Sequence, residues 1–290
     1  MDHKINTIVL NGRVAADAWI EDIKNKILAL KRQPRLGIIQ IGDNLASSTY
    51  IKNKLNIAKK VNVIAEHLKF NANYSQDQLI NLINDLQNND LYDGILIQLP
   101  LPEQINEIKV LQTLKTTYDV DGLSVATTAK IWNTKKFNPL EEVVPCTPKG
   151  IIKLLNHYQI DCQGKKIVII NRSNIVGKPL AAMLLALDAT VSICHSRTKN
   201  LIEYTSTADI IITGVGKTNF LTPNLVAKHA VVIDVSINFD HQKKLVGDVP
   251  RNSLLNHCQA YSPVPNGVGP MTVAAIFDNL YLLTKKKITQ

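Results

Sequence analysis

The sequence predicts an α/β fold made of two domains with parallel sheets. Short apolar runs, such as GIIQI, GILIQL and KIVII, have the length of buried strands. These runs alternate with segments of helical periodicity almost throughout, which is typical of βαβ units and parallel sheets. The 290 residues are enough for about two domains of ordinary size.

The first domain is expected over residues 1–140. Its strands are predicted at 35–41, 66–70 and 94–99. Two segments with helical periodicity lie between them, at 47–61 and 76–89. Ser75 precedes the second of these helices and is a residue type that caps helix N-termini. A less regular stretch at 117–147 is interpreted as the connection to the second domain.

The second domain is expected over residues 141–268. Pro148 suits the first turn of its opening helix. Apolar runs predict strands at 165–170, 190–194, 208–213 and 230–235, with a helix at 177–187. A long terminal helix, at about 269–290, has apolar residues at spacings of three and four.

Composition is that of a globular protein with a sizeable core, since 45% of the residues are hydrophobic and 20% are charged. The apolar runs are far shorter than the roughly 20 residues of a membrane span. The N-terminus lacks the pattern of a secretory signal, so we expect a cytoplasmic protein without membrane contact. The cysteines are scattered, without C-x-x-C spacing, and buried inert thiols are expected. They are Cys146, Cys162, Cys194 and Cys258.

The chain carries a formal net charge of 33 − 24 = +9 at pH 7. Basic residues are mostly dispersed and aromatic residues are few, so a nucleic-acid partner is not favoured. The one tight basic run, at 285–287, is expected to be a solvated helix end. A basic chain also attracts small polyanions such as dinucleotide phosphates. The seven histidines lack paired-ligand spacing, and no metal site is expected.

A candidate phosphate-binding loop, NRSNIVGKPL, follows the first strand of the second domain. Strand, tight loop and helix N-terminus together offer backbone N–H groups and a helix dipole to a pyrophosphate. The usual G-x-G-x-x-G is absent and only Gly177 remains, so an ordinary turn between strand and helix stays open as the alternative.

The end of the next strand bears on the choice of dinucleotide. Where an NAD enzyme places an acid for the ribose hydroxyls, the chain has His195, Ser196 and Arg197. With Arg172 in the preceding loop, these side chains favour a 2′-phosphate, and hence NADP over NAD. The alternative is that they are exposed polar residues after a strand, without a ligand.

The segment GVGKT (214–218) is similar to a phosphate-binding P-loop. That motif needs a glycine five residues before Gly216, where the chain has Ile211. Pro223 also interrupts any immediate helix. The sequence therefore argues against a P-loop.

Tyr50 and Lys54 are four residues apart in SSTYIKNKLNIAKK, so on a helix their side chains share one face. A phenol and an ammonium on one face can meet one substrate, but a solvated lysine-rich helix produces the same spacing. Short-chain dehydrogenases also use a Tyr-x-x-x-Lys pair, although there the cofactor loop precedes the pair. Here the pair comes first, so that family is the wrong template.

Eight stretches, in order along nearly the whole chain, together carry a specific family resemblance. They are IGDNLASSTYIKNK (41–54), DGILIQLPLP (93–102), DVDGL (119–123), PCTPKG (145–150), RSNIVGKPLAAMLL (172–185), CHSRT (194–198), VVIDVSIN (231–238) and SPVPNGVGPMT (262–272). With them the chain resembles the bifunctional methylenetetrahydrofolate dehydrogenase/methenyltetrahydrofolate cyclohydrolase family.

The resemblance implies a folate-binding catalytic domain at 1–140, completed by the C-terminal helix at about 269–290. It also implies a Rossmann-like NADP-binding domain at 141–268, a cleft that holds both ligands, and a homodimer. The implied reactions belong to one-carbon metabolism and supply purine biosynthesis. They are oxidation of 5,10-methylene-tetrahydrofolate by NADP⁺ and hydrolysis of the methenyl product to 10-formyl-tetrahydrofolate. The preference for polyglutamated folate stays open.

The same resemblance assigns the site residues. Lys54 is implied as the key catalytic residue, with Tyr50 and Gln98 in support and Asp121 on the pterin ring. The remaining folate contacts implied are Leu99, Pro265, Asn266 and Gly267. The cofactor contacts implied are Asn171, Arg172, Ser173, Gly177, Ser196, Arg197 and Ile237. Independently of the family, a lysine does acid–base work at neutral pH only if burial or neighbours lower its pKa.

The chain departs from the family pattern at four positions. Asn171, Ser236 and Asn266 stand where the family usually has glycine, and Leu123 replaces a phenylalanine. Asparagine tolerates positive φ better than most residues, so both asparagine loops are expected to survive. Ser236 is expected close to the nicotinamide. A cyclohydrolase with weakened dehydrogenase activity is therefore an alternative, as is a non-catalytic NADP- or folate-binding protein on the same fold.

Overall fold

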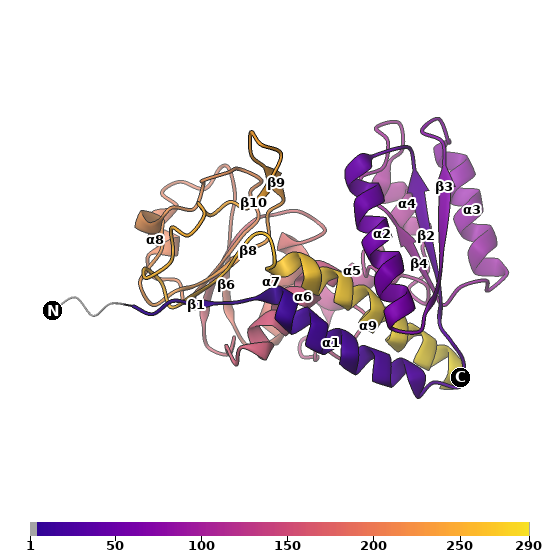
Figure 1. The fold of residues 1–290 in the computed structure, drawn as a ribbon, viewed down its shortest axis with the longest axis horizontal. Coiled ribbons are helices and arrows are strands. Elements are labelled where there is room, and N and C mark those ends of the chain that lie inside the picture. Colours follow the sequence, from indigo (N-terminus) through magenta and orange to yellow (C-terminus); the bar gives the residue numbers. More distant parts are fainter. Residues whose placement is uncertain (1–4, 290) are drawn as a thin grey trace. The chain divides into compact units, whose positions relative to one another are not determined.

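The structure, a computed structural model, describes residues 5–289, except for the side chains of residues 45–47 and 49. The chain forms two compact units (Figure 1). Unit 1 comprises Met1–Asp17, Thr134–Leu140 and Thr147–Thr272. Unit 2 comprises Ala18–Asn133, Glu141–Cys146 and Val273–Gln290.

Unit 2 contains a parallel sheet in the order β3-β2-β4. Its strands are β2 (Arg35–Ile41), β3 (Ile64–Phe70) and β4 (Gly94–Ile97). The helices packed around it are α2 (Leu45–Lys60), α3 (Gln76–Asn88) and α4 (Glu107–Thr113). Figure 1 shows α2 and α3 on either side of β2 and β3. One apolar cluster joins the sheet to α3 and α4, with Ile39 and Ile95 from the strands, Leu79 and Ile83 from α3, and Val110 from α4.

The start of α3 matches its sequence prediction. Ser75 accepts a hydrogen bond from the backbone N–H of Gln78, and the Gln78 side chain accepts one from the N–H of Ser75. This reciprocal capping box satisfies two N–H groups that the helix leaves without internal partners.

Unit 1 contains, within the described residues, a six-stranded sheet in the order β1-β11-β8-β7-β5-β6. Every neighbouring pair in it is parallel. The strands are β1 (Ile8–Val9), β5 (Lys166–Ile170), β6 (Thr190–Cys194), β7 (Ile210–Thr213), β8 (Val231–Asp234) and β11 (Ala260–Ser262). Between them run α6 (Cys146–His157), α7 (Gly177–Ala186), the short α8 (Ile202–Thr205) and the 3-10 turn η1 (Pro223–Leu225). A small antiparallel pair, β9 (Asn238–Phe239) and β10 (Leu245–Val246), follows β8.

The strand order of unit 1 has a reversal point beside β5. After β5 the chain goes to β6 on one side and then to β7 on the other side of β5. In open parallel sheets, ligands bind outside the carboxyl ends of the strands at such a reversal point. The loops that follow β5, β6 and β7 are therefore the expected binding edge.

Two helices connect the units in sequence. The helix α1 (Gly12–Leu28) begins in unit 1 and continues into unit 2, and α9 (Val268–Thr289) does the same. The sequence predicts domains at 1–140, completed by the C-terminal helix at about 269–290, and at 141–268, whereas the compact units divide the first 140 residues between them. Residues up to Asp17 belong to unit 1 because β1 pairs with β11, with Ile8 beside Ala260.

Several predicted elements have different bounds in the structure. The strand predicted at 94–99 ends at Ile97, two residues before the Leu99–Pro100 peptide, where proline has no N–H for the ladder. The stretch predicted to be irregular at 117–147 contains the helix α5 (Val125–Asn133). Its sequence has modest helix propensity, and a local contact starts it, because the Asp119 carboxylate accepts the N–H of Ser124, five residues further on, at 2.8 Å.

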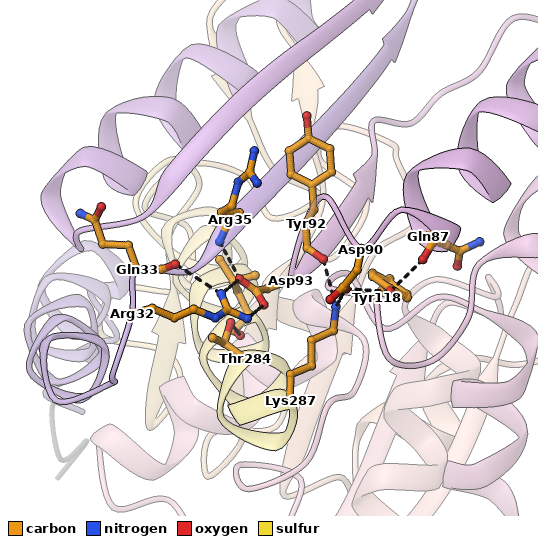
Figure 2. Close-up of polar contacts among 11 residues, drawn as sticks. Arg32, Gln33, Arg35, Gln87, Asp90, Tyr92, Asp93, Tyr118, Thr284 and Lys287 are labelled. Carbon is orange, nitrogen blue, oxygen red and sulfur yellow. Dashed lines mark hydrogen bonds and ion pairs between the residues drawn. The ribbon is translucent and has the colours of Figure 1, made fainter. Parts of the chain in front are cut away.

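The basic run at 285–287 is only in part the solvated helix end that the sequence predicted, since Lys285 and Lys286 are exposed and Lys287 is not. The Lys287 side chain is 17% exposed, and its Nζ lies 2.7 Å from Asp90 Oδ1 and 3.0 Å from the carbonyl oxygen of Tyr92. The same ammonium lies 3.7 Å from the ring centroid of Tyr118 (Figure 2). Nearby in Figure 2, Arg32 donates two hydrogen bonds to the buried Asp93 carboxylate. Lys287 thus anchors the last turns of α9 to the loop before β4.

The cysteines are buried, as predicted, and none of the four is part of a disulfide. Burial raises the pKa of the Cys162 and Cys258 thiols to about 11. Across the described residues, no helix is long and apolar enough to span a membrane. Within the same residues, no group of three or more histidine, cysteine, aspartate or glutamate side chains is placed to hold a metal ion.

Replacing Lys287 by methionine keeps the stem and removes the ammonium. We expect the free energy of unfolding to fall by about 1–2 kcal/mol, because an ion pair, a backbone hydrogen bond and a cation–π contact are lost together. Urea titration measures this. Lys285→Met is the control, because the Lys285 ammonium lies 5.9 Å from the ring of Tyr281 on its own helix. Equal losses in the two variants would contradict the anchoring role.

Candidate active site

Lys54 is a buried lysine that points at the carboxyl end of β4. It lies on α2 and is 8% exposed. Its Nζ donates a hydrogen bond of 2.8 Å to Gln98 Oε1, and Gln98 directly follows β4. The Gln98 amide in turn donates to the carbonyl oxygen of Leu99 at 2.7 Å. That second bond orients the amide, so its oxygen faces the lysine.

Asp121 belongs to the same site. A parallel bridge pairs Asp119 with Ile95, so Asp121 lies level with Ile97 at the carboxyl end of β4. Burial raises the pKa of the Asp121 carboxyl, and the Lys54 charge opposes that shift. Burial lowers the pKa of Lys54, and the charge of Asp121 opposes that shift. The two groups therefore interact electrostatically. The net shift of the Lys54 pKa is downward, in the direction that acid–base work requires.

Tyr50 and Leu99 are the other two residues of unit 2 that the family resemblance assigns to the folate site. Tyr50 lies one helical turn before Lys54 on the same face of α2 and is half-buried. Burial raises the pKa of its phenol, which stays protonated and able to donate at neutral pH. Leu99 is partly buried and packs against the apolar cluster of unit 2, as does Leu123, the position where the family usually has phenylalanine.

The predicted cofactor residues all follow strands of unit 1. Asn171, Arg172 and Ser173 come after β5, Ser196 and Arg197 after β6, and Ile237 after β8. Since β5 and β6 are parallel neighbours in the sheet, the loops that follow them lie at the same carboxyl edge. The Arg172, Ser196 and Arg197 side chains are exposed, and Ile237 is 54% exposed.

Asn171 ties the carboxyl ends of β5 and β7 together. Its Nδ2 donates to the carbonyl oxygen of Gly214 at 2.5 Å, and its Oδ1 accepts the N–H of Ser173 at 2.7 Å. We expected asparagine here to be tolerated through positive φ, but Asn171 is not among the positive-φ residues. Its side chain instead stabilises the loop after β5 through these two hydrogen bonds. Gly177 sits so close that an added Cβ would lie 2.1 Å from the Asn171 carbonyl oxygen, which brings the start of α7 against the loop.

The backbone N–H groups of the loop GVGK after β7 donate hydrogen bonds to a side chain of the protein itself. The fully buried Asp248 carboxylate accepts the backbone N–H groups of Val215, Gly216 and Lys217 at 2.7 to 3.1 Å. It also accepts the Thr213 hydroxyl at 2.7 Å. These N–H groups have a carboxylate partner, which agrees with the argument from sequence against a P-loop.

Ser236 turns its hydroxyl into the same loop. It is 6% exposed, and its Oγ accepts the N–H of Gly216 at 3.4 Å. Its backbone N–H donates to Asp234 Oδ1 at 3.0 Å. The hydroxyl that replaces the family's usual glycine hydrogen is therefore engaged inside unit 1.

The loop 263–267 of unit 1 carries the last three predicted folate residues. Pro265 and Asn266 are exposed and Gly267 is buried. Asn266 has a φ of 71°, as expected for an asparagine in place of glycine, and its carbonyl oxygen accepts the Gly12 N–H at 2.7 Å. An added Cβ at Gly12 would lie 1.8 Å from the Gly267 oxygen, so the loop packs tightly on the start of α1.

Three polar residues to which the sequence analysis gave no role in the site stabilise the backbone around Asp121 and the loop after β7. They are Cys146 and Asn279 beside Asp121 in unit 2, and Asp248 beneath the β7 loop in unit 1. Asn279 had a signal, since it interrupts the apolar run of the terminal helix. For Cys146 and Asp248, residue spacing in the sequence gave no signal of this role.

Comparison with known proteins decides the family. The family model described as "Tetrahydrofolate dehydrogenase/cyclohydrolase, catalytic domain" matches residues 10–121. The model described as "Tetrahydrofolate dehydrogenase/cyclohydrolase, NAD(P)-binding domain" matches residues 145–288. The chain belongs to the tetrahydrofolate dehydrogenase/cyclohydrolase family.

Individual members of the tetrahydrofolate dehydrogenase/cyclohydrolase family are similar over nearly their full length. The bifunctional protein FolD of Campylobacter hominis is 41% identical over 283 residues, which is 97% of this chain and 98% of the relative. The FolD crystal structure from Campylobacter jejuni has a TM-score of 0.91 at 38% identity, over 97% of this chain and 99% of the other. A Trypanosoma brucei structure, described as complexed with NADP cofactor and inhibitor, has a TM-score of 0.91 at 27% identity over 98% and 99%.

Unit 1 fits a dinucleotide by its own geometry. A binding edge needs close backbone approach at the first loop and a helix that starts there. Gly177 supplies the close approach to Asn171, and α7 begins at that glycine. The family's NAD(P)-binding description and this edge of the sheet therefore agree.

Asp234 gives unit 1 a pH-dependent stability. Burial raises the pKa of its carboxyl to about 6, against about 3.9 in an unfolded chain. The folded state thus favours the protonated form, so the stabilisation is complete below about pH 4 and is lost as pH rises through about 6. We expect Asp234→Asn to flatten the fall in unfolding free energy between pH 4 and 7, by up to about 3 kcal/mol. Urea titrations at several pH values measure it, and an unchanged slope would contradict the assignment.

Proposed function

We propose that this chain oxidises 5,10-methylene-tetrahydrofolate with NADP⁺ and hydrolyses the 5,10-methenyl product to 10-formyl-tetrahydrofolate. Family membership supports both activities. The observation that carries the proposal is the buried Lys54 ammonium, which donates to Gln98 at 2.8 Å and interacts with Asp121. A solvated, lysine-rich helix face would not produce it.

Lys54 is the acid–base group of the hydrolysis in this proposal. Water must add to an amidinium-like carbon, and a proton must then move to the departing nitrogen. Burial lowers the pKa of Lys54, which is the direction that acid–base work by a lysine requires. Gln98 holds the ammonium by its hydrogen bond, and Tyr50 presents a protonated phenol from the same face of α2.

Asp121 binds the pterin ring in this proposal. Its carboxyl lies at the carboxyl end of β4, near Lys54, and offers oxygens that accept hydrogen bonds from the N–H groups of a polar heterocycle. Leu99 adds apolar contact beside Gln98, and the loop 263–267 is assigned to the folate as well. We also propose the corresponding division of labour, with the folate residues mainly in unit 2 and the cofactor residues in unit 1.

The dinucleotide is assigned to the carboxyl edge of the unit 1 sheet. When bound, NADP⁺ accepts the hydride removed from the folate methylene. The loop from Asn171 to Ser173 and the start of α7 at Gly177 hold the pyrophosphate, and Ile237 lies against the cofactor. Arg172, Ser196 and Arg197 meet the 2′-phosphate, which is supported by their exposure next to the reversal point.

The weakened-dehydrogenase alternative rests on Asn171 and Ser236. Both side chains are engaged in hydrogen bonds within unit 1, to Gly214 and Gly216 respectively. That engagement supports an intact dehydrogenase. Normal methenyl hydrolysis without any NADP⁺-dependent oxidation would establish the alternative.

We further propose a cytoplasmic homodimer whose folate substrates include polyglutamated forms. The free, buried cysteines support a reducing compartment. The homodimer is supported by the family, whose members usually form one. A nucleic-acid partner is not proposed, since Lys287 of the basic run is occupied by Asp90 and Tyr118.

Lys54→Met tests the catalytic assignment. We expect the cyclohydrolase rate to fall at least about a hundredfold, the usual contribution of a positioned acid–base group. The free energy of unfolding should also fall, because the buried Asp121 carboxyl loses its opposite charge, so the rate is compared per folded enzyme. The loss of methenyl absorbance measures the rate. Lys59→Met, at an exposed position of the same helix, is the control. Wild-type rates in Lys54→Met would show the mechanism to be wrong.

A cofactor exchange tests the dinucleotide assignment. With methylene-tetrahydrofolate, kcat/KM should be higher for NADP⁺ than for NAD⁺. Arg172→Ala should lower the NADP⁺ value about tenfold to a hundredfold, because a charge-assisted hydrogen bond to phosphate is lost. The NAD⁺ value serves as the internal control and should stay within about twofold. A preference for NAD⁺, or equal losses with both cofactors, would contradict the 2′-phosphate assignment.

A further inference from the structure

A buried asparagine on the C-terminal helix holds the backbone on both sides of the site in unit 2. Asn279 lies on α9 and is 0% exposed. Its side-chain Nδ2 donates to the carbonyl oxygen of Val120 at 3.0 Å and to that of Val144 at 2.8 Å. The two hydrogens of one amide group thus join two segments that are distant in sequence.

Both acceptors adjoin residues of the site. Val120 immediately precedes Asp121, and Val144 precedes Pro145 and Cys146. The segments also bond directly, since the Cys146 N–H donates to the Asp121 carbonyl oxygen at 3.1 Å. The Cys146 thiol donates to the Val120 carbonyl oxygen at 3.4 Å and lies 3.4 Å from Asn279 Nδ2.

The segments are in backbone contact at Gly122. This residue has a φ of 71°, and an added Cβ would lie 2.3 Å from the carbonyl carbon of Val144. Such close packing fixes the direction in which the chain leaves Asp121. The direction of the Asp121 side chain is therefore set by the crossing that Asn279 holds together.

We propose that Asn279 is a positioning residue for folate binding, acting through the backbone of Val120 and Val144 on the Asp121 carboxylate. The inference rests on the proposed folate role of Asp121. Without the amide, two buried carbonyl oxygens lose donors, and the crossing relaxes to recover them. Asp121 then leaves its place beside Lys54, because the interaction between the two charges falls with distance.

The test is Asn279→Ala in the full-length enzyme. We expect the KM for the methenyl and methylene folates to rise about tenfold or more, as for loss of a hydrogen bond to a charged group. The KM for NADP⁺ should change by less than about twofold. Calorimetry with 5-formyl-tetrahydrofolate should show the same loss in affinity. A residue that only stabilised the fold would lower the active fraction and leave both KM values unchanged.

Thr284→Val is the matched control. Thr284 is equally buried on α9, and its hydroxyl bonds within the helix to the Leu280 carbonyl oxygen at 2.9 Å. This variant should keep the wild-type KM for folate. Asn279→Ser retains one donor and should give an intermediate KM, which keeps the proposal testable if the alanine variant does not fold.

Asp121→Ala separates this inference from the proposed function. If Asp121→Ala raises the folate KM and the Asn279 variants do not, the positioning role is wrong and the proposed function stands. If Asp121→Ala leaves the folate KM unchanged, the pterin assignment of Asp121 fails, and with it the basis of the inference. A rise in folate KM in Thr284→Val as large as in Asn279→Ala would also overturn the positioning role.

Discussion

The candidate active site depends on holding a lysine side chain in a place where water hardly reaches it. Lys54 is 8% exposed, and burial pulls its pKa down while the charge of Asp121 pushes it up. Removal from water disfavours the charged form of both the lysine and the carboxyl. Their mutual attraction and the hydrogen bond to Gln98 offset that cost. The surrounding loops are therefore arranged to hold three side chains from three segments at fixed separation.

In both units the residues that we assign to ligands lie mainly at the carboxyl edge of a parallel sheet. Gln98 follows β4 and Asn171 follows β5, so each strand delivers a polar side chain where its backbone ladder ends. Residues beyond these edges are held by side chains that accept or donate several bonds at once. Asp248 does this for the loop after β7, and Asn279 for the segment around Asp121. Buried, fully satisfied polar groups of this kind rigidify the loops that carry function.

The sequence predicted most strands and helices, because buried parallel strands leave apolar runs and surface helices leave a periodic pattern. It also predicted the helix that carries Lys54 and the loop between β5 and α7 that we assign to the dinucleotide. It missed α5, which starts because the Asp119 carboxylate accepts the Ser124 N–H. It also missed the engaged state of Lys287, because Asp90 is close in space but distant along the chain. Hydrophobic periodicity does not indicate a hydrogen bond from a side chain to a nearby backbone N–H, as at α5, nor a contact between residues distant in sequence, as at Lys287.

The bridge made by Asn279 has a consequence for the order in which the protein is built. The Val120 carbonyl that it binds is separated from it by 159 positions in sequence. At a synthesis rate of about 5–20 residues per second, that segment waits roughly ten to thirty seconds for its partner. The sheet of unit 2 consists of strands made early, and they can pair before α9 exists. The scaffold of the site therefore forms first, and its final geometry is imposed by a segment that is synthesised later.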